Sequence, residues 1–376
     1  MRVAPHSINS LYIHLPFCDG RCRYCAFYSI LYDASLADRL LRALAVELAL
    51  WQEQGLGFNL ETIYLGGGTP SLLTPLQLQG LGRLLAPHLA RDVALEWSVE
   101  MNPGSVTPAR LAALLEGGVN RFSLGAQSFG EPVLRLLGRR HSAADITRSV
   151  AIMRRAGVAN LALDLMAGIP GCAPDTWQHS LSAALALNPQ HISVYALTAE
   201  EGTQLQRAMA RGQPVPQSDA EQLAELDLAE NLLTAAGYAR YEISNYARAG
   251  FSCRHHCACW RGGEYIGLGP AAASHVGDLR WTNAADLPAY LEALENQQPP
   301  PRSWDPLTPE IKTLERLICG LRMSAGVEAA LVTDYVPALQ SLCGQGLVEL
   351  NGTHWRLTPR GRQLADYVAV ELMVTS

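Results

Sequence analysis

The sequence of 376 residues predicts an α/β fold, namely a partial, open (β/α)6 barrel of the TIM type followed by a smaller C-terminal α+β domain. Within residues 11–196, short β-rich runs alternate with segments whose apolar residues recur at helical spacing. After a proline-rich stretch near residue 300 the pattern changes to helical segments followed by two short strands. The first observation predicts the barrel and the second predicts a separate domain.

Six strands are expected in the first half of the chain, with a helical segment after each. Their ranges are 11–15, 62–65, 94–100, 121–126, 161–166 and 191–196. Because each strand can return to the same edge of the sheet only through a crossover, the sheet is expected to be parallel. Six units, where a complete barrel has eight, predict a barrel that does not close.

Three domains are expected along the chain. Residues 1–200 form the barrel core, and residues 201–300 form an extension with a helix around 218–236 and a stretch rich in Gly, His and Cys. Prolines mark residues 295–306 as a linker. Residues 301–376 are expected to form a winged-helix-like domain, with its two-stranded wing turning at Asn351 and Gly352.

Composition and charge exclude several classes of protein. With 48% hydrophobic and 17% charged residues, the chain is neither disordered nor disulfide-rich. A net charge of −6 without a basic tract argues against nucleic acid as a partner and against a polybasic membrane anchor. The N-terminus has no signal peptide and no apolar run is long enough to span a membrane, so a cytoplasmic location is expected. In that reducing compartment the nine cysteines are expected to be ligands, catalytic thiols or buried residues.

Polar residues and glycines gather at the carboxyl ends of the expected strands. In parallel α/β barrels these ends face a common cavity where the chemistry takes place. The segment GGGTP at residues 66–70, with three glycines in a row, would let the backbone approach a ligand closely. Glycine turns, capping carboxylates and a solvated arginine are the ordinary alternatives for each residue alone. Their joint placement favours a binding site, with candidates Glu100, Gln127, Arg139 and Asp164.

Three cysteines follow the first expected strand in the spacing C-x3-C-x2-C, as Cys18, Cys22 and Cys25. A structural zinc site needs a fourth ligand, and none is offered nearby. A 4Fe-4S cluster is held by thiolates on its irons. Three cysteines would therefore leave one iron open to a ligand of another kind. The more distant Cys172, Cys319 and Cys343 are expected to be packing residues.

This loop resembles that of the radical S-adenosylmethionine (SAM) superfamily. The resemblance implies a 4Fe-4S cluster on the three cysteines, SAM bound to its open iron through amino and carboxylate groups, and reductive cleavage of SAM to a 5′-deoxyadenosyl radical. It implies that Tyr12 lies against the cluster and that Glu100 and Asp164 accept hydrogen bonds from the ribose. The remaining contacts with SAM fall to Gly67, Gly68, Thr69, Gln127 and Arg139, and the fork of an arginine matches a carboxylate.

Further segments narrow the resemblance to the coproporphyrinogen III dehydrogenase-like branch and, within it, to the HemW-type heme chaperones. They include LYIHLPFC, YLGGGTPS, DLMAGIPG, ISVYALTAEEGT and YEISNYA, and they cover nearly the whole chain. The dehydrogenase typically has a further cysteine where this chain has Phe27, and it has a long segment before its first strand. Both differences favour the chaperone, which implies heme binding and transfer of heme to an acceptor protein.

The candidate heme-binding segment lies around His255. The chaperones usually carry His-Asn-x-x-Tyr-Trp here, whereas this chain has His256 in place of Asn and Cys259 before Trp260. Histidine and cysteine thiolate are both axial ligands of heme iron. His255, with Cys257 and Cys259, is therefore the candidate ligand set. The alternative is that these are buried cysteines and surface histidines.

Two other functions remain open at this stage. The SAM-binding residues would equally serve a radical SAM enzyme, either an oxygen-independent coproporphyrinogen III dehydrogenase or a related methyltransferase. A winged-helix regulator with a redox-sensing cluster is the third hypothesis. The expected partners are heme and an unnamed heme-accepting protein, a homodimer is compatible with the sequence, and neither nucleic acid nor a transmembrane segment is expected.

Overall fold

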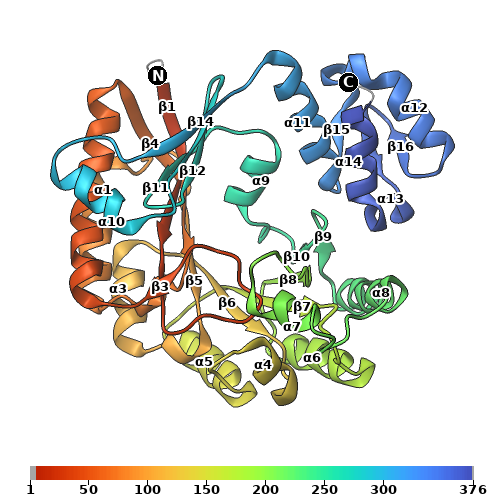
Figure 1. The fold of residues 1–376 in the computed structure, drawn as a ribbon, viewed down its shortest axis with the longest axis horizontal. Coiled ribbons are helices and arrows are strands. Elements are labelled where there is room, and N and C mark those ends of the chain that lie inside the picture. Colours follow the sequence, from red (N-terminus) through yellow and green to blue (C-terminus); the bar gives the residue numbers. More distant parts are fainter. Residues whose placement is uncertain (1–5, 375–376) are drawn as a thin grey trace.

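The computed structural model of the chain describes residues 6–374. Within them, a nine-stranded sheet has the order β11-β1-β4-β5-β6-β7-β8-β10-β9. Figure 1 shows this sheet curved, with helices along its outer face and the C-terminal domain to one side. Within residues 6–374 every helix is too short or too polar to cross a lipid bilayer.

The six central strands are those expected from the sequence, and neighbouring strands pair in parallel. Their side chains form near-continuous buried apolar runs, which is typical of parallel strands covered on both faces. The partial (β/α)6 barrel is thereby confirmed. The strands are β1 (His6–Leu15), β4 (Leu56–Gly67), β5 (Glu96–Met101), β6 (Arg121–Gln127), β7 (Asn160–Ala167) and β8 (His191–Ala196).

Several of the helices begin at side chains that cap their free backbone amides. Thr74, Ser142 and Ser218 each form a reciprocal capping box, which satisfies two amides at once. The expected helix around 218–236 is confirmed as α8. The helices are α1 (Ala34–Glu53), α2 (Pro75–Leu85), α3 (Pro108–Gly117), α4 (Glu131–Leu137), α5 (Ala143–Arg155), α6 (Pro174–Ala186), α7 (Gln204–Met209) and α8 (Asp219–Ala235). Short 3-10 turns include η1 (Pro70–Leu72), η2 (Ala86–His88) and η3 (Pro103–Ser105).

Three short strands extend the two edges of the barrel. β10 (Asn245–Ala247) pairs antiparallel with β8 and with β9 (Ala239–Arg240), whereas β11 (Ile266–Leu268) pairs parallel with β1 at the opposite edge. Helix α9 (Arg254–Trp260) connects β10 to β11. The chain therefore crosses from one edge of the open barrel to the other through α9.

A small antiparallel sheet follows, made of β12 (Ala273–Val276), β13 (Leu279–Asn283) and β14 (Arg302–Pro306), with α10 (Leu287–Glu295) between the last two. The linker expected at 295–306 is wrong in its second half, because residues 302–306 form β14. Trp304 pairs with Trp281 in the sheet, and their rings lie 5.2 Å apart. The packing of these two rings stabilises β14 in the sheet. The nearby prolines do not prevent this, because an edge strand tolerates proline.

The C-terminal domain has its own apolar core, built around Leu317, Leu339 and Leu372. The expected hairpin is confirmed, and Gly352 adopts the positive φ of 60° that such a turn requires. The elements are α11 (Pro309–Arg322), β15 (Val327–Glu328), η4 (Ala329–Leu331), η5 (Thr333–Tyr335), α12 (Val336–Gly344), β16 (Val348–Asn351), β17 (His354–Leu357), α13 (Pro359–Gln363) and α14 (Ala365–Val374).

Candidate functional site

The cysteine loop lies at the carboxyl end of β1. Two short parallel strands, β2 (Phe17–Cys18) and β3 (Ile30–Leu31), hold its ends together. Within it, the amide of Cys25 donates to the carbonyl of Cys22 at 3.3 Å. Burial raises the pKa of the Cys18 thiol, and the neighbouring Cys25 and Cys22 raise it further. The three free, partly exposed thiols thus lie close enough to influence one another.

Side chains from other strand ends hold this loop. Arg139 donates to Cys22 Sγ at 3.4 Å, to Asn102 Oδ1 at 2.6 Å and to the carbonyl of Gly125 at 2.8 Å. Thr69 Oγ1 lies 3.8 Å from Cys18 Sγ and accepts a hydrogen bond from Asn102 at 2.8 Å. A cation and a hydroxyl therefore face two of the thiols, where they would stabilise thiolates.

Three thiols in one loop are the kind of side chain that iron–sulfur clusters take as ligands. Among residues 6–374, no three His, Cys, Asp or Glu side chains are grouped tightly enough to hold one ion. A 4Fe-4S cluster takes one thiolate at each of several separate irons. A loop that offers three thiols fits that requirement and would leave an iron for another kind of ligand.

Glu100 and Asp164 line the interior of the barrel behind the loop. Glu100 accepts a hydrogen bond from Tyr64 Oη at 2.9 Å, and Asp164 accepts from Ser123 Oγ at 3.1 and 3.2 Å. Burial raises the pKa of Glu100 to about 7, and the Asp164 carboxylate adds to that effect. These two carboxyl groups can accept hydrogen bonds from hydroxyl donors in the barrel interior.

We expect Glu100→Gln to change how the stability of the ligand-free protein depends on pH. The raised pKa means that the folded protein holds this proton more tightly than the unfolded chain, whose value is near 4.5. That stabilisation is fully present below pH 4.5 and is lost as the pH rises through 7. The wild type should lose about 1–3 kcal/mol of its free energy of unfolding across this window, the lower figure allowing for solvent in the cavity.

Urea denaturation at several pH values measures this effect. Glu100→Gln should show a flatter dependence on pH, whereas the exposed Glu53→Gln on α1 should follow the wild type. A Glu100→Gln curve parallel to that of the wild type would contradict the assignment.

The glycines after β4 allow two pieces of backbone to approach each other. A Cβ on Gly67, where φ is +101°, would lie 2.7 Å from the ring of His14, and one on Gly68 would lie 2.6 Å from the carbonyl oxygen of Phe17. The amide of Gly68 donates to the carbonyl of Leu15 at 2.9 Å. The sequence led us to expect an approach to a ligand, and the structure adds a close approach to β1 and to the start of the cysteine loop.

Tyr12 and Gln127 complete the set expected from the sequence. Tyr12 Oη lies 3.0 Å from His14 Nδ1, and the Tyr12 ring is 6.4 Å from that of Tyr64 in the barrel interior. Gln127 adopts a positive φ of 65° where the register between β6 and β7 shifts. The carbonyl of Gly125 in the same bulge accepts from Arg139. Along with the loop glycines, these residues therefore lie at strand positions that surround one end of the barrel.

The candidate heme-binding residues of α9 lie in different surroundings. His255 is 4% exposed, its Nδ1 lies 2.9 Å from Thr62 Oγ1, and its ring stacks on Tyr64 with centroids 5.4 Å apart. Cys257 borders a surface pocket with Arg254 and Arg261, whereas Cys259 borders a different pocket. The structure does not bring these three candidates together around one point.

Three further residues connect these regions, and two of them, Tyr64 and Arg121, belong to no motif that marks them in the sequence. Tyr64 bonds to Glu100 and stacks on His255, so it joins the carboxylates to α9. Asn102 links Arg139 to Thr69. Arg121 is buried at the start of β6, and burial together with its charge lowers the pKa of His255 to about 4. The His255 ring is therefore neutral at neutral pH and keeps a lone pair for a metal.

Comparison with known protein families gives two matches along the chain. The Radical SAM superfamily matches residues 12–184, which include the cysteine loop and the strands up to β7. The HemN C-terminal domain matches residues 307–364. The two matches fall on the barrel and on the C-terminal domain respectively.

Curated relatives match over nearly their whole length. The heme chaperone HemW of Bacillus subtilis is 32% identical, with 96% of this chain and 98% of that protein covered. HemW of Mycobacterium tuberculosis is 35% identical, with 96% and 94% covered, and HemW of Escherichia coli is 33% identical, with 94% and 95% covered. Among solved structures, the coproporphyrinogen III oxidase HemN of Escherichia coli has a TM-score of 0.84 at 24% identity, with 98% of this chain and 91% of that chain covered. This last likeness is one of fold.

Proposed function

This chain belongs to the HemW family of heme chaperones within the radical SAM superfamily, and from that membership we propose that it binds heme and transfers it to an acceptor protein. The observation that carries the proposal is the similarity to HemW proteins across both the barrel and the C-terminal domain. The acceptor would be a protein that requires heme for its own activity.

We propose that Cys18, Cys22 and Cys25 hold a 4Fe-4S cluster. When bound, the cluster would supply an open iron for SAM and an electron for its reductive cleavage. The hydrogen bond of Arg139 to Cys22 and the hydroxyl of Thr69 beside Cys18 support this proposal, because donors and positive charge favour the thiolate form of a cysteine.

The proposed SAM site extends from the cluster along the strand ends. Glu100 and Asp164 would accept from ribose hydroxyls, and their position inside the barrel supports this role. Arg139 already donates to three protein acceptors, which supports a role in positioning the loop and Asn102. The full set of proposed contacts is Tyr12, Gly67, Gly68, Thr69, Glu100, Gln127, Arg139 and Asp164.

Heme is proposed to bind beside α9, with His255, Cys257 and Cys259 as candidate ligands of its iron. The neutral state of His255 supports this, because a protonated imidazole cannot bind a metal. Cysteine thiolate is likewise an axial ligand of heme iron.

Heme titration of protein purified without oxygen tests the proposed function. We expect a Soret band that saturates near one heme per chain, followed by transfer of that heme to an added apo-protein that binds heme. Absence of a Soret band would contradict the proposal. Incubation with dithionite, SAM and coproporphyrinogen III should give no vinyl product. Formation of that product would show that the protein acts as the dehydrogenase and would contradict the chaperone function.

A further inference from the structure

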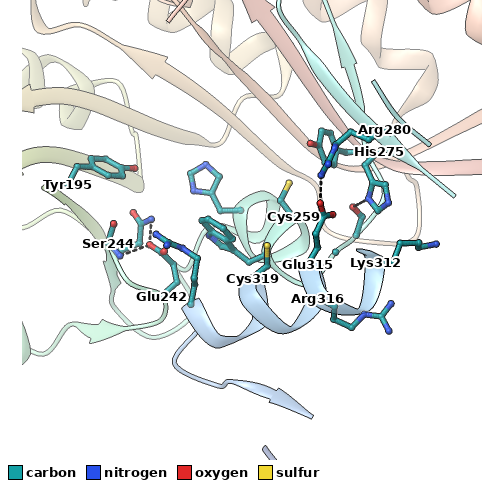
Figure 2. A pocket seen from close by; sticks show the side chains of 17 residues that line it. Tyr195, Glu242, Ser244, Cys259, His275, Arg280, Lys312, Glu315, Arg316 and Cys319 are labelled. Carbon is teal, nitrogen blue, oxygen red and sulfur yellow. Dashed lines mark hydrogen bonds and ion pairs between the residues drawn. The ribbon is translucent and has the colours of Figure 1, made fainter. Parts of the chain in front are cut away.

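A pocket of about 470 Å³ lies where α9 of the barrel faces α11 of the C-terminal domain, as Figure 2 shows. Its volume lies within the roughly 300–1,000 Å³ that is usual for cofactor-sized ligands. The aromatic side chains of Tyr195, Trp260 and Tyr265 contribute to its walls. Both domains therefore build this pocket, and its aromatic lining suits a flat apolar ring system.

One face of α9 borders the pocket. His256, Cys259 and Trp260 line it, and their spacing of i, i+3 and i+4 places them on the same side of a helix. His256 and Cys259 occupy the positions where this chain differs from the usual His-Asn-x-x-Tyr-Trp pattern. The residues that depart from the pattern are thus two potential iron ligands that face the pocket, whereas His255 packs against β4.

Helix α11 presents a matching face from the C-terminal domain. Lys312, Glu315 and Cys319 line the pocket at intervals of three and four residues. Cys319 lines the same pocket as Cys259, and Figure 2 shows the two side chains facing the same space from α11 and α9. Two free thiols, one from each domain, therefore line one pocket, although the sequence led us to expect that Cys319 only packs.

The cations around the pocket differ in their partners. Arg280 pairs with Asp305 and Glu315, and Lys312 pairs with Asp278. Among residues 6–374, Arg316 on α11 has neither an ion pair nor a hydrogen bond, and its side chain is exposed. An unpaired guanidinium at the edge of a pocket suits the carboxylate of a ligand.

We propose that heme binds in this pocket, where the thiols of Cys259 and Cys319 would be ligands of its iron and Arg316 would pair with a propionate. This inference rests on the proposed function, because it specifies where that function's cargo lies. On binding, each coordinating thiol releases its proton to solvent and its sulfur forms the bond to iron. Heme would then join α9 to the C-terminal domain, and separation of the two domains would release it.

Heme titration of Cys259→Ser, Cys319→Ser and Arg316→Gln tests this placement. We expect each variant to weaken binding by about tenfold or more, the usual scale for loss of a ligand or its supporting contact. The two serine variants should also lose the absorption and magnetic resonance signature of thiolate-bound heme. The matched controls are Cys343→Ser and Arg360→Gln, whose exposed side chains lie elsewhere in the C-terminal domain, and both should bind like the wild type.

The outcomes separate this placement from the proposed function. Heme binding by the wild type that is unchanged in all three variants, or that is lost only in His255→Ala, would overturn the placement and leave the chaperone function standing. Absence of binding by the wild type would overturn the function itself. Because Arg316 is exposed, the Arg316→Gln variant should keep the fold. This variant therefore tests the proposed placement of heme even if a serine variant fails to fold.

Discussion

Protein with Cys22→Ser, purified without oxygen, is expected to contain almost no iron or sulfide and to lack the broad visible absorption of the wild type. Cys22 is one of three thiols proposed to hold the cluster, and a serine hydroxyl is a poor substitute for a thiolate on iron. The loop contributes few side chains to the apolar core, so far-ultraviolet circular dichroism should be unchanged. Iron and sulfide analysis on the same samples measures the effect.

Cys343→Ser is the matched control, because it removes an exposed thiol from the C-terminal domain. That variant should keep its full iron and sulfide content. Stoichiometric zinc in the wild type would contradict the cluster, as would a full cluster in Cys22→Ser. Loss of SAM binding by Cys22→Ser, but not by Cys343→Ser, would further connect the cofactor to the open iron.

The barrel could be predicted because each central strand has a signal of its own. Runs such as residues 161–166, apolar except for Asp164, are short and bounded by turns, and they alternate with amphipathic helices. The strands that extend the barrel could not be predicted in this way. β9, β10 and β11 have only two or three residues each, which is too short for an alternation of apolar and polar residues to appear. Pairing of β10 with β8 and of β11 with β1 determines their structure.

The candidate site shows the same division between local and tertiary signals. The cysteine loop could be recognised because its three cysteines lie within eight residues of one another in the sequence. Tyr64 could not, since it is an ordinary strand residue until folding brings it to Glu100. For α9, the sequence did not show how this seven-residue helix is rotated about its axis. That rotation determines whether His255 or His256 faces the pocket.

Gly68→Ala and Gly80→Ala add the same methyl group and are expected to have opposite effects on stability. A Cβ at Gly68 would lie 2.6 to 2.8 Å from backbone atoms of Pro16 and Phe17, which cannot rotate away as a side chain can. Overpacking of this kind costs about 1–3 kcal/mol. Gly80 lies inside α2 with nothing within 4 Å of its added Cβ, so alanine there should stabilise the protein by about 0.5–1 kcal/mol.

Chemical denaturation and iron analysis of both variants test whether this close approach also serves the cluster. The amide of Thr69 donates to the carbonyl of Phe17 at 2.7 Å, so displacing residues 68–69 should move the backbone that carries Cys18. Gly68→Ala should therefore lose iron as well as stability, whereas Gly80→Ala should keep its iron. Equal iron content in the two variants would mean that the loop can hold its ligands without that contact, and that the glycine serves the packing of the barrel alone.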